Sequence, residues 1–168
     1  MPADPDFYPL IPGLIREYRS RGAAGTGLVR FEVLSVSWKE GKTLARCRRT
    51  RSQGGGLETK DFTARREPSG VYSSGQKEFP LPVWLGRRWR SEPVEFEVSE
   101  LEAVVTVPAG KFEGCLKVFY RIGGGDGGSG ERIYAPGIGL VREDCSDEAD
   151  PFELALTRFV LPGRGDVV

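Results

Sequence analysis

The chain has 168 residues, with 24 basic and 24 acidic side chains and therefore no formal net charge, and it contains no histidine. This length suits one domain that folds without a disulfide or a structural metal. The absence of histidine excludes Ser-His and Cys-His catalytic pairs and zinc sites that use imidazole, and no apolar run approaches the 18 residues of a membrane-spanning helix.

The charges are divided unevenly along the chain. Residues 1–90 hold 17 basic and 9 acidic side chains, whereas residues 91–168 hold 7 and 15. A basic half can indicate nucleic acid binding. Because an acidic half with an equal excess is present in the same chain, we expect ion pairs between the halves on neighbouring strands, and we do not expect nucleic acid as a partner.

In the first third of the chain, the pattern predicts an irregular start, then one short strand and a hairpin of two longer strands. Residues 1–13 are rich in proline and are expected to be irregular. Alternation predicts a strand over 14–19 and a hairpin formed by 28–38 and 43–51. The apolar positions change parity near Val33-Leu34, which predicts a β-bulge there.

The middle of the chain predicts shorter strands over 57–66 and 71–72. The segment 78–85 contains Pro80 and Pro82, so it is at best an edge strand. Within it, Leu81, Val83 and Trp84 are candidates for contact with a partner. Trp84 would be an anchor for a partner if exposed and part of the core if buried.

The last part of the chain alternates strongly and contains two turn motifs. The apolar positions change parity near Ser99-Glu100, which predicts a second bulge in the strand 94–107. Pro108-Ala109-Gly110 predicts a turn between strands. Further strands are expected over residues 116–122, 131–134, 140–143 and 152–161. A flexible tail is expected at 162–168.

No stretch shows the periodicity of an amphipathic helix. About ten short strands separated by turns predict an all-β fold, either an antiparallel β-barrel or a strongly curved half-barrel, formed by residues 1–168 as a single domain.

Four patterns that can indicate chemistry have simpler structural explanations. Gly125, Gly127 and Gly130 match a dinucleotide-binding spacing, but a strand pattern follows where that motif needs a helix. Glu95 and Glu97 are expected to be solvated on the polar face of a strand. Two further groups of charged residues are also expected to be exposed to solvent. The first is an acidic loop, formed by Glu143, Asp144, Asp147, Glu148 and Asp150. The second consists of arginine-rich runs, formed by Arg46, Arg48, Arg49, Arg51, Arg87, Arg88 and Arg90.

Cys47, Cys115 and Cys145 are far apart and show no metal-binding spacing. One disulfide and one free thiol are possible in an oxidising compartment, and the spacing does not say which residues would pair. No metal or cofactor is predicted.

Three segments form a recognisable combination: Phe7-Tyr8-Pro9-Leu10 with Gly13 and Tyr18, then residues 106–118 (TVPAGKFEGCLKV), then residues 134–142 (YAPGIGLVR). Together they resemble the TapB-like family of bacterial envelope β-proteins of unknown function. The resemblance covers nearly the whole chain and implies no catalytic residues. It implies the cell envelope or periplasm if a signal has been removed; without one, the cytoplasm is expected, because Met1 is not followed by a signal-like segment.

The motif residues have structural explanations. Pro108 and Gly110 would make a turn, while Pro136, Gly137 and Gly139 would break a strand so that it bends around the barrel. Gly139 is expected at positive φ, or in a bulge, beside a packed aromatic side chain.

The sequence therefore predicts a non-enzymatic binding or assembly protein of the bacterial cell envelope that contacts an unknown protein partner. The alternative is a protein that binds a lipid or another apolar small molecule inside the barrel.

Overall fold

The computed structural model describes residues 4–124, 127–147 and 150–163. These residues form 12 strands in one antiparallel sheet and contain no helix, which confirms the all-β prediction with 12 strands in place of about ten. None of the described residues forms a helix that could cross a membrane.

The strands follow one another along the chain with short connections. They are β1 (Ile15–Gly22), β2 (Gly25–Lys39), β3 (Lys42–Gln53), β4 (Gly56–Glu67), β5 (Gly70–Ser73), β6 (Gln76–Pro80), β7 (Arg88–Ser91), β8 (Val94–Val107), β9 (Gly110–Ile122), β10 (Ser129–Ala135), β11 (Gly139–Cys145) and β12 (Phe152–Val160).

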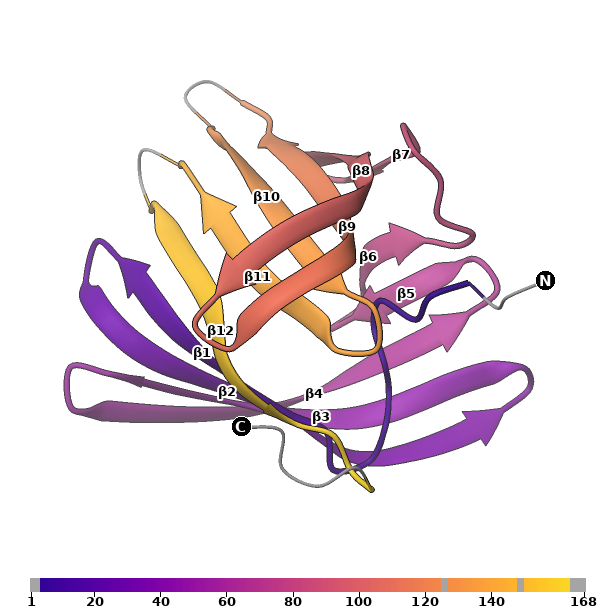
Figure 1. Ribbon diagram of the computed structural model, residues 1–168, viewed down its shortest axis with the longest axis horizontal. Coiled ribbons are helices and arrows are strands. Elements are labelled where there is room, and N and C mark those ends of the chain that lie inside the picture. Colours follow the sequence, from indigo (N-terminus) through magenta and orange to yellow (C-terminus); the bar gives the residue numbers. More distant parts are fainter. Residues whose placement is uncertain (1–3, 125–126, 148–149, 164–168) are drawn as a thin grey trace.

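The strand order is β6-β5-β4-β3-β2-β1-β12-β11-β10-β9-β8-β7. The sheet therefore consists of two meanders joined where β1 pairs with β12. It curves into a nearly closed barrel in which β6 and β7, consecutive along the chain, flank the open seam (Figure 1). Pro80 and Pro82 lie at this edge, as the sequence predicts, because proline cannot donate to a neighbouring strand.

Both predicted bulges are present. The pairing of β2 with β3 shifts register between Val33 and Ser35, and the pairing of β8 with β9 shifts between Val98 and Glu100. Each shift lets a strand change the face on which its apolar residues lie, which is what the change of parity indicated.

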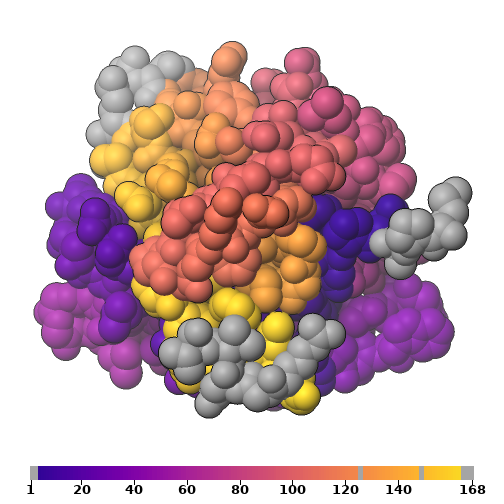
Figure 2. Space-filling view, viewed as in Figure 1, coloured from indigo at the N-terminus to yellow at the C-terminus, as the bar shows by residue number. Residues whose placement is uncertain are grey.

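The second bulge lets one hairpin cover both faces of its neighbours. Phe96 and Val98 of β8 point into the barrel core, whereas Val105 and Val107 belong to a second cluster with Ile133 of β10. The far half of the β8–β9 hairpin crosses over β10, β11 and β12 and covers them (Figures 1 and 2). The Ala109 amide donates to the Leu156 carbonyl at 3.0 Å, and the rings of Phe112 and Phe159 are 6.1 Å apart.

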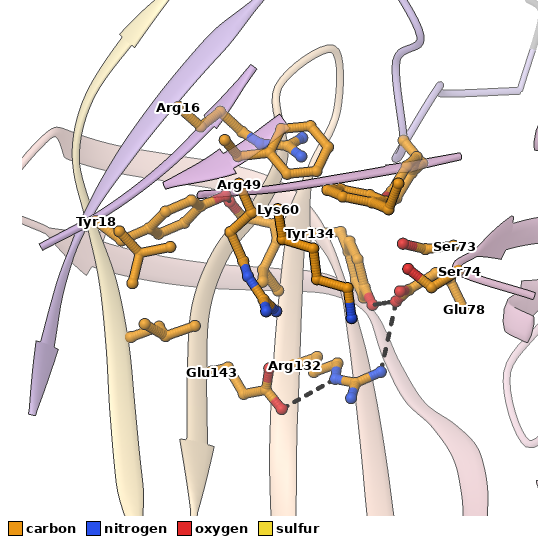
Figure 3. Close-up of a pocket in the computed structure, with 16 residues that line it drawn as sticks. Arg16, Tyr18, Arg49, Lys60, Ser73, Ser74, Glu78, Arg132, Tyr134 and Glu143 are labelled. Carbon is orange, nitrogen blue, oxygen red and sulfur yellow. Dashed lines mark hydrogen bonds and ion pairs between the residues drawn. The ribbon is translucent and has the colours of Figure 1, made fainter. Parts of the chain in front are cut away.

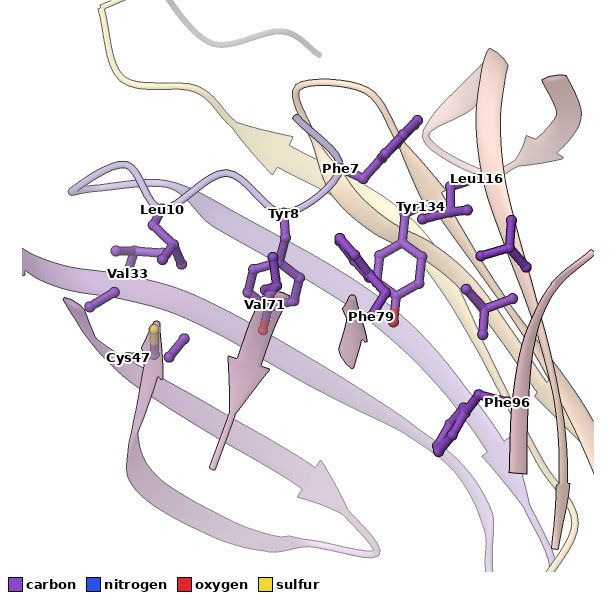
Figure 4. Close-up of a cluster of buried hydrophobic side chains, with 14 of the residues drawn as sticks. Phe7, Tyr8, Leu10, Val33, Cys47, Val71, Phe79, Phe96, Leu116 and Tyr134 are labelled. Atoms are coloured by element: carbon purple, nitrogen blue, oxygen red, sulfur yellow. The ribbon is translucent and has the colours of Figure 1, made fainter. Parts of the chain in front are cut away.

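The described part of the N-terminal segment is irregular, as predicted, but it is not a loose surface segment. Phe7, Tyr8 and Leu10 are buried against the barrel core (Figure 4). Arg66 pairs with the Asp6 carboxylate and donates to the Tyr8 carbonyl at 2.9 Å. The segment therefore packs into the barrel as part of its core.

Ion pairs between a cation of residues 1–90 and a carboxylate of residues 91–168, which the charge division predicts, occur in the described residues only beside the boundary between the halves, and most of the ion pairs in the described residues join two side chains of the same half. On neighbouring strands, Arg88 pairs with Glu97 at 3.4 Å and Arg90 with Glu95 at 3.6 Å. Arg158 of β12 pairs with Glu17 of β1 at 3.3 Å, but here the cation belongs to the acidic half and the carboxylate to the basic half. These contacts lie on strand β7 and at the junction of the two meanders.

Candidate functional site

A cavity of about 210 Å³ lies inside the barrel, between the strands of the first meander and β10–β12 (Figure 3). Its lining combines apolar side chains with an unusual number of charged and hydroxyl groups. The lining residues are Tyr8, Arg16, Tyr18, Val29, Phe31, Arg49, Lys60, Phe62, Ser73, Ser74, Glu78, Arg132, Tyr134, Leu140, Glu143 and Leu154.

Four of these residues form one row across the first meander. The register places Arg16 of β1 opposite Phe31 of β2, Phe31 opposite Arg49 of β3, and Arg49 opposite Lys60 of β4. Residues opposite each other in a sheet project from the same face, so all four side chains extend into the barrel. Figure 3 shows Arg49 and Lys60 reaching into the cavity toward Arg132.

The neighbouring row, on the outer face, has complementary charges. Glu32 lies opposite Arg48, which lies opposite Asp61, and Arg48 Nε donates to the Asp61 carboxylate at 2.7 Å. The inner row has no such alternation, because Arg49 and Lys60 are two cations directly opposite each other. In the described part of the chain neither of them makes an ion pair or a hydrogen bond through its side chain.

Arg16 is a buried cation at the inner end of this row, and only 2% of its surface is exposed. Its Nη1 donates to the Ile138 carbonyl at 2.9 Å, and its guanidinium lies over the Phe31 ring at 4.2 Å. Its Nε has no hydrogen-bond partner, and no carboxylate among residues 4–124, 127–147 and 150–163 pairs with it. A buried charge without a counterion is costly in free energy.

Gly139 makes room for Arg16. It has a φ of +100°, as predicted, and the Arg16 guanidinium lies where its side chain would be. The packed neighbour is thus an arginine and not the aromatic residue that the sequence suggested.

Arg132 of β10 is the centre of a hydrogen-bonded network on the opposite wall. Its guanidinium contacts Glu143 at 3.0 Å and Glu78 at 3.4 Å. The hydroxyl of Tyr120 donates to Glu143 at 2.9 Å, and that of Tyr134 donates to Glu78 at 2.8 Å. Gly130 permits this arrangement, because a side chain there would overlap the Tyr120 ring.

Burial and the nearby charges fix the protonation states of Arg132 and the two tyrosines. Burial and the neighbouring carboxylates raise the pKa of Tyr120 and Tyr134, so both hydroxyls stay protonated and act as donors. Burial alone would lower the pKa of Arg132, but the neighbouring carboxyl groups of Glu78 and Glu143 raise it above its usual value. Near neutral pH, Arg132 is therefore charged and both tyrosine hydroxyls are neutral donors.

Sequence reasoning missed this network. The prediction that Glu143 lies in a solvated acidic loop is wrong: it is 7% exposed, on β11. One signal was available, since Val141, Glu143 and Cys145 alternate with more exposed residues along β11. The rest of the acidic segment carries no metal site within the described residues, and Glu148 lies outside them.

The predicted partner contacts lie in the linker between β6 and β7, away from the cavity. Leu81 and Val83 are half-buried against the core, whereas Trp84 is 50% exposed and Leu85 63%. The Arg87 guanidinium stacks over the Trp84 ring at 3.9 Å. Trp84 is therefore a surface residue beside the open seam.

The two motif segments form hairpin turns. Pro108 and Ala109 connect β8 to β9, with Gly110 at a φ of +142°, as predicted. The prediction that Pro136, Gly137 and Gly139 bend one strand around the barrel is wrong. Residues 136–138 form the turn of the β10–β11 hairpin, and Gly137 has a φ of +76°.

The arginine-rich runs do not form one basic patch. Arg46 and Arg48 pair with Asp61, Arg90 pairs with Glu92, and Trp89 stacks on Phe96 with ring centroids 5.3 Å apart. The three cysteines are buried and free: Cys47, Cys115 and Cys145. Burial raises the pKa of the Cys47 and Cys115 thiols to about 11, which makes them poor nucleophiles.

No family model and no curated protein sequence matches the chain. Two solved structures have similar folds. A putative lipoprotein from Parabacteroides distasonis has 15% sequence identity and a TM-score of 0.63, over 93% of this chain and 99% of that one. A putative exported protein with a YmcC-like fold from Bacteroides fragilis has 18% identity and a TM-score of 0.67, over 94% and 100%. At these identities the likeness shows a shared fold.

Proposed function

We propose that this chain is a non-enzymatic binding protein of the bacterial cell envelope, and that it holds a small ligand in the cavity inside its barrel. The observation that carries the proposal is the cavity of about 210 Å³ inside the barrel, where charged, hydroxyl and apolar side chains converge. Ligand sites are typically concave and mostly apolar with a few convergent polar groups, and the lining of this cavity has that character.

The location in the envelope is supported by two similarities. The structural neighbours bear the names putative lipoprotein and putative exported protein. The turn motifs at 106–118 and 134–142 resemble those of the TapB-like family of envelope proteins. Fractionation of cells that express the gene from its natural start tests this: the protein is expected with the envelope or periplasm, and recovery with the cytoplasm would contradict it.

A binding role fits the chemistry of the cavity better than catalysis does. Glu78 and Glu143 are both engaged by Arg132 and a tyrosine hydroxyl, and Tyr120 and Tyr134 have raised pKa values. Proton transfer near neutral pH needs groups that titrate in that range. Arg132 and the two tyrosines instead supply a fixed positive charge and two hydrogen-bond donors.

Cavity binding is tested by native mass spectrometry of the protein purified from the envelope. A bound small molecule is expected on the parent protein. It should be lost in Leu154→Phe, which places a larger side chain in the cavity. Leu28→Phe is the matched control, because Leu28 is on β2 and 62% exposed. Retention of the same molecule by the Leu154 variant, at a melting temperature equal to that of the control, would contradict the proposal.

A second candidate function, assembly with a protein partner, is favoured by the exposure of Trp84 and Leu85 beside the open seam. Exposed tryptophan side chains often anchor interfaces. If this surface binds an envelope partner, Trp84→Ala abolishes recovery of that partner while Leu28→Ala does not, at unchanged stability of both. Equal recovery by both variants would exclude Trp84 as the anchor.

A further inference from the structure

We infer that the cavity selects an organic anion, and that Arg49 and Lys60 bind its acidic group at the cavity mouth while its apolar part lies on the inner wall. The inference rests on the proposed cavity function and adds the class of ligand. Nothing in it depends on the surface near Trp84.

The first observation is that two cations face each other on neighbouring strands and, within the described residues, have no carboxylate partner. Arg49 and Lys60 lie directly opposite each other on β3 and β4, and like charges in that arrangement repel. At the adjacent position, Asp61 lies opposite Arg48 and pairs with it, so this part of the sheet can accommodate an ion pair. The inner face presents two cations where the outer face presents an ion pair.

The second observation is the charge balance of the whole lining. Four cations line the cavity, at positions 16, 49, 60 and 132, against two carboxylates, Glu78 and Glu143. Both carboxylates form ion pairs with Arg132, and each accepts a hydrogen bond from a tyrosine hydroxyl. An excess of two positive charges is therefore left, and a cleft with low-dielectric walls focuses such a field on an entering ligand.

The third observation is the order of polar and apolar groups along the cavity. Lys60 is exposed and Arg49 half-buried, whereas Arg16 is almost fully buried. Apolar wall residues from four strands surround these cations: Val29, Phe31, Phe62, Leu140 and Leu154. A ligand with its acidic group at Lys60 keeps that group near water and places its apolar part among these side chains.

The volume limits the size of the apolar part. The cavity has about 210 Å³, somewhat more than the ~150 Å³ apolar cavity that accommodates benzene in another protein. It therefore suits an aromatic ring or a short acyl chain. The acidic group can be a carboxylate or a phosphate, since both accept charge-assisted hydrogen bonds from arginine and lysine.

The experiment compares three probes that share one acyl chain: octanoate, octyl phosphate and 1-octanol. Each is titrated into the full chain by isothermal titration calorimetry at low ionic strength, where charge recognition is strongest. At least one anion is expected to bind about 10–100-fold more tightly than the alcohol, and added salt should reduce that preference. The two anions distinguish a carboxylate from a phosphate ligand.

The variant Arg49→Gln/Lys60→Gln is expected to lose about 10–100-fold in affinity for the preferred anion and to bind 1-octanol as before. The variant Lys39→Gln/Arg121→Gln is its matched control. It removes the same two charges from exposed positions that do not line the cavity, and should bind all probes like the parent. Circular dichroism melting verifies that both variants are folded.

The outcomes separate this inference from the proposed function. Equal binding of octanol and both anions, or an anion preference that survives in Arg49→Gln/Lys60→Gln, would overturn the anion inference and leave cavity binding intact. Absence of binding for all three probes would overturn both. An anion preference lost only in the cavity variant supports both.

Discussion

The guanidinium of Arg16 occupies the space that a side chain on Gly139 would fill. The two residues lie on β1 and β11, and the Arg16 side chain reaches past Gly139 to the carbonyl of Ile138. Gly139 is thus required both for its backbone conformation and for the close approach of a buried cation.

Gly139→Ala is expected to lower the free energy of unfolding by about 2–4 kcal/mol, because it adds backbone strain and displaces Arg16. Urea denaturation measures the loss. Gly137→Ala is the matched control: φ is +76° and no atom lies within 4 Å of the added carbon, so only strain of about 1 kcal/mol is expected. Equal losses would show that the contact with Arg16 is unimportant.

Glu143→Ala is expected to destabilise the fold by about 2–4 kcal/mol, because it leaves the Tyr120 hydroxyl and one side of Arg132 without an acceptor. Asp144→Ala, at the next position, removes a partly exposed partner of Arg142 and should cost at most about 1 kcal/mol. Thermal melting of the two variants compares them. Similar melting temperatures would contradict a structural role for the buried network.

Lys60→Glu is expected to stabilise the ligand-free protein by about 0.2–1 kcal/mol, because it converts a repelling pair with Arg49 into a cross-strand ion pair. Lys60→Gln, which removes the repulsion only, should give a smaller increase. Urea denaturation at low salt measures both. A decrease in stability for both variants would mean that the cations at 49 and 60 do not repel each other in the folded protein.

Stability is expected to fall above about pH 9. Burial raises the pKa of the Cys47 thiol from 9.0 to about 11 and raises the pKa of Tyr120 and Tyr134 above the usual value of 10.0. The unfolded chain therefore releases these protons first, so the stabilisation is complete below pH 9 and is lost as the pH rises through these ranges.

Melting temperatures measured from neutral pH to pH 11 test this expectation. Tyrosinate absorbance and circular dichroism should change together in alkali, because the buried hydroxyls titrate only when the fold opens. Full ionisation of all five tyrosines before any loss of structure would contradict it.

Trp84→Ala is expected to cost less than about 1.5 kcal/mol, because half of the side chain is already exposed and its main contact is the stacked Arg87. Phe79→Ala, five residues earlier and 1% exposed, should cost about 3–5 kcal/mol. Chemical denaturation of the two variants gives the comparison. A loss at Trp84 as large as that at Phe79 would make it a core residue.

The strands and bulges could be predicted because alternation along a strand is a local property of the sequence. Val33 and Ser99 illustrate this, since the change of parity beside each marks a shift of register. Strand β7 was missed because it has only four residues, of which Trp89 is the one apolar member. β7 is a strand because it pairs with β8, and a sequence of four residues does not reveal such pairing.

The candidate site could not be predicted, because it depends on which residues lie opposite one another. Ala45 and Cys47 indicate that Arg49 is on the inner face of β3. Nothing in the sequence of β3 says that Lys60 faces it or that Phe31 lies on its other side; the lengths of the two hairpins decide this. Likewise Arg132 and Glu78 are 54 positions apart in sequence, and only closure of the barrel brings them together.

The strand order has a consequence for how the chain can be rearranged. In the described sheet, β1 and β12 are the one pair of neighbours that are not consecutive along the chain, and they bring Ile15 opposite Val160. A circular permutant that begins at Gly86 and joins the present ends through a linker would therefore run through the strands in spatial order. All neighbouring strands would then be consecutive along the chain, so such a permutant should fold faster than the natural arrangement, with the open seam at its new termini.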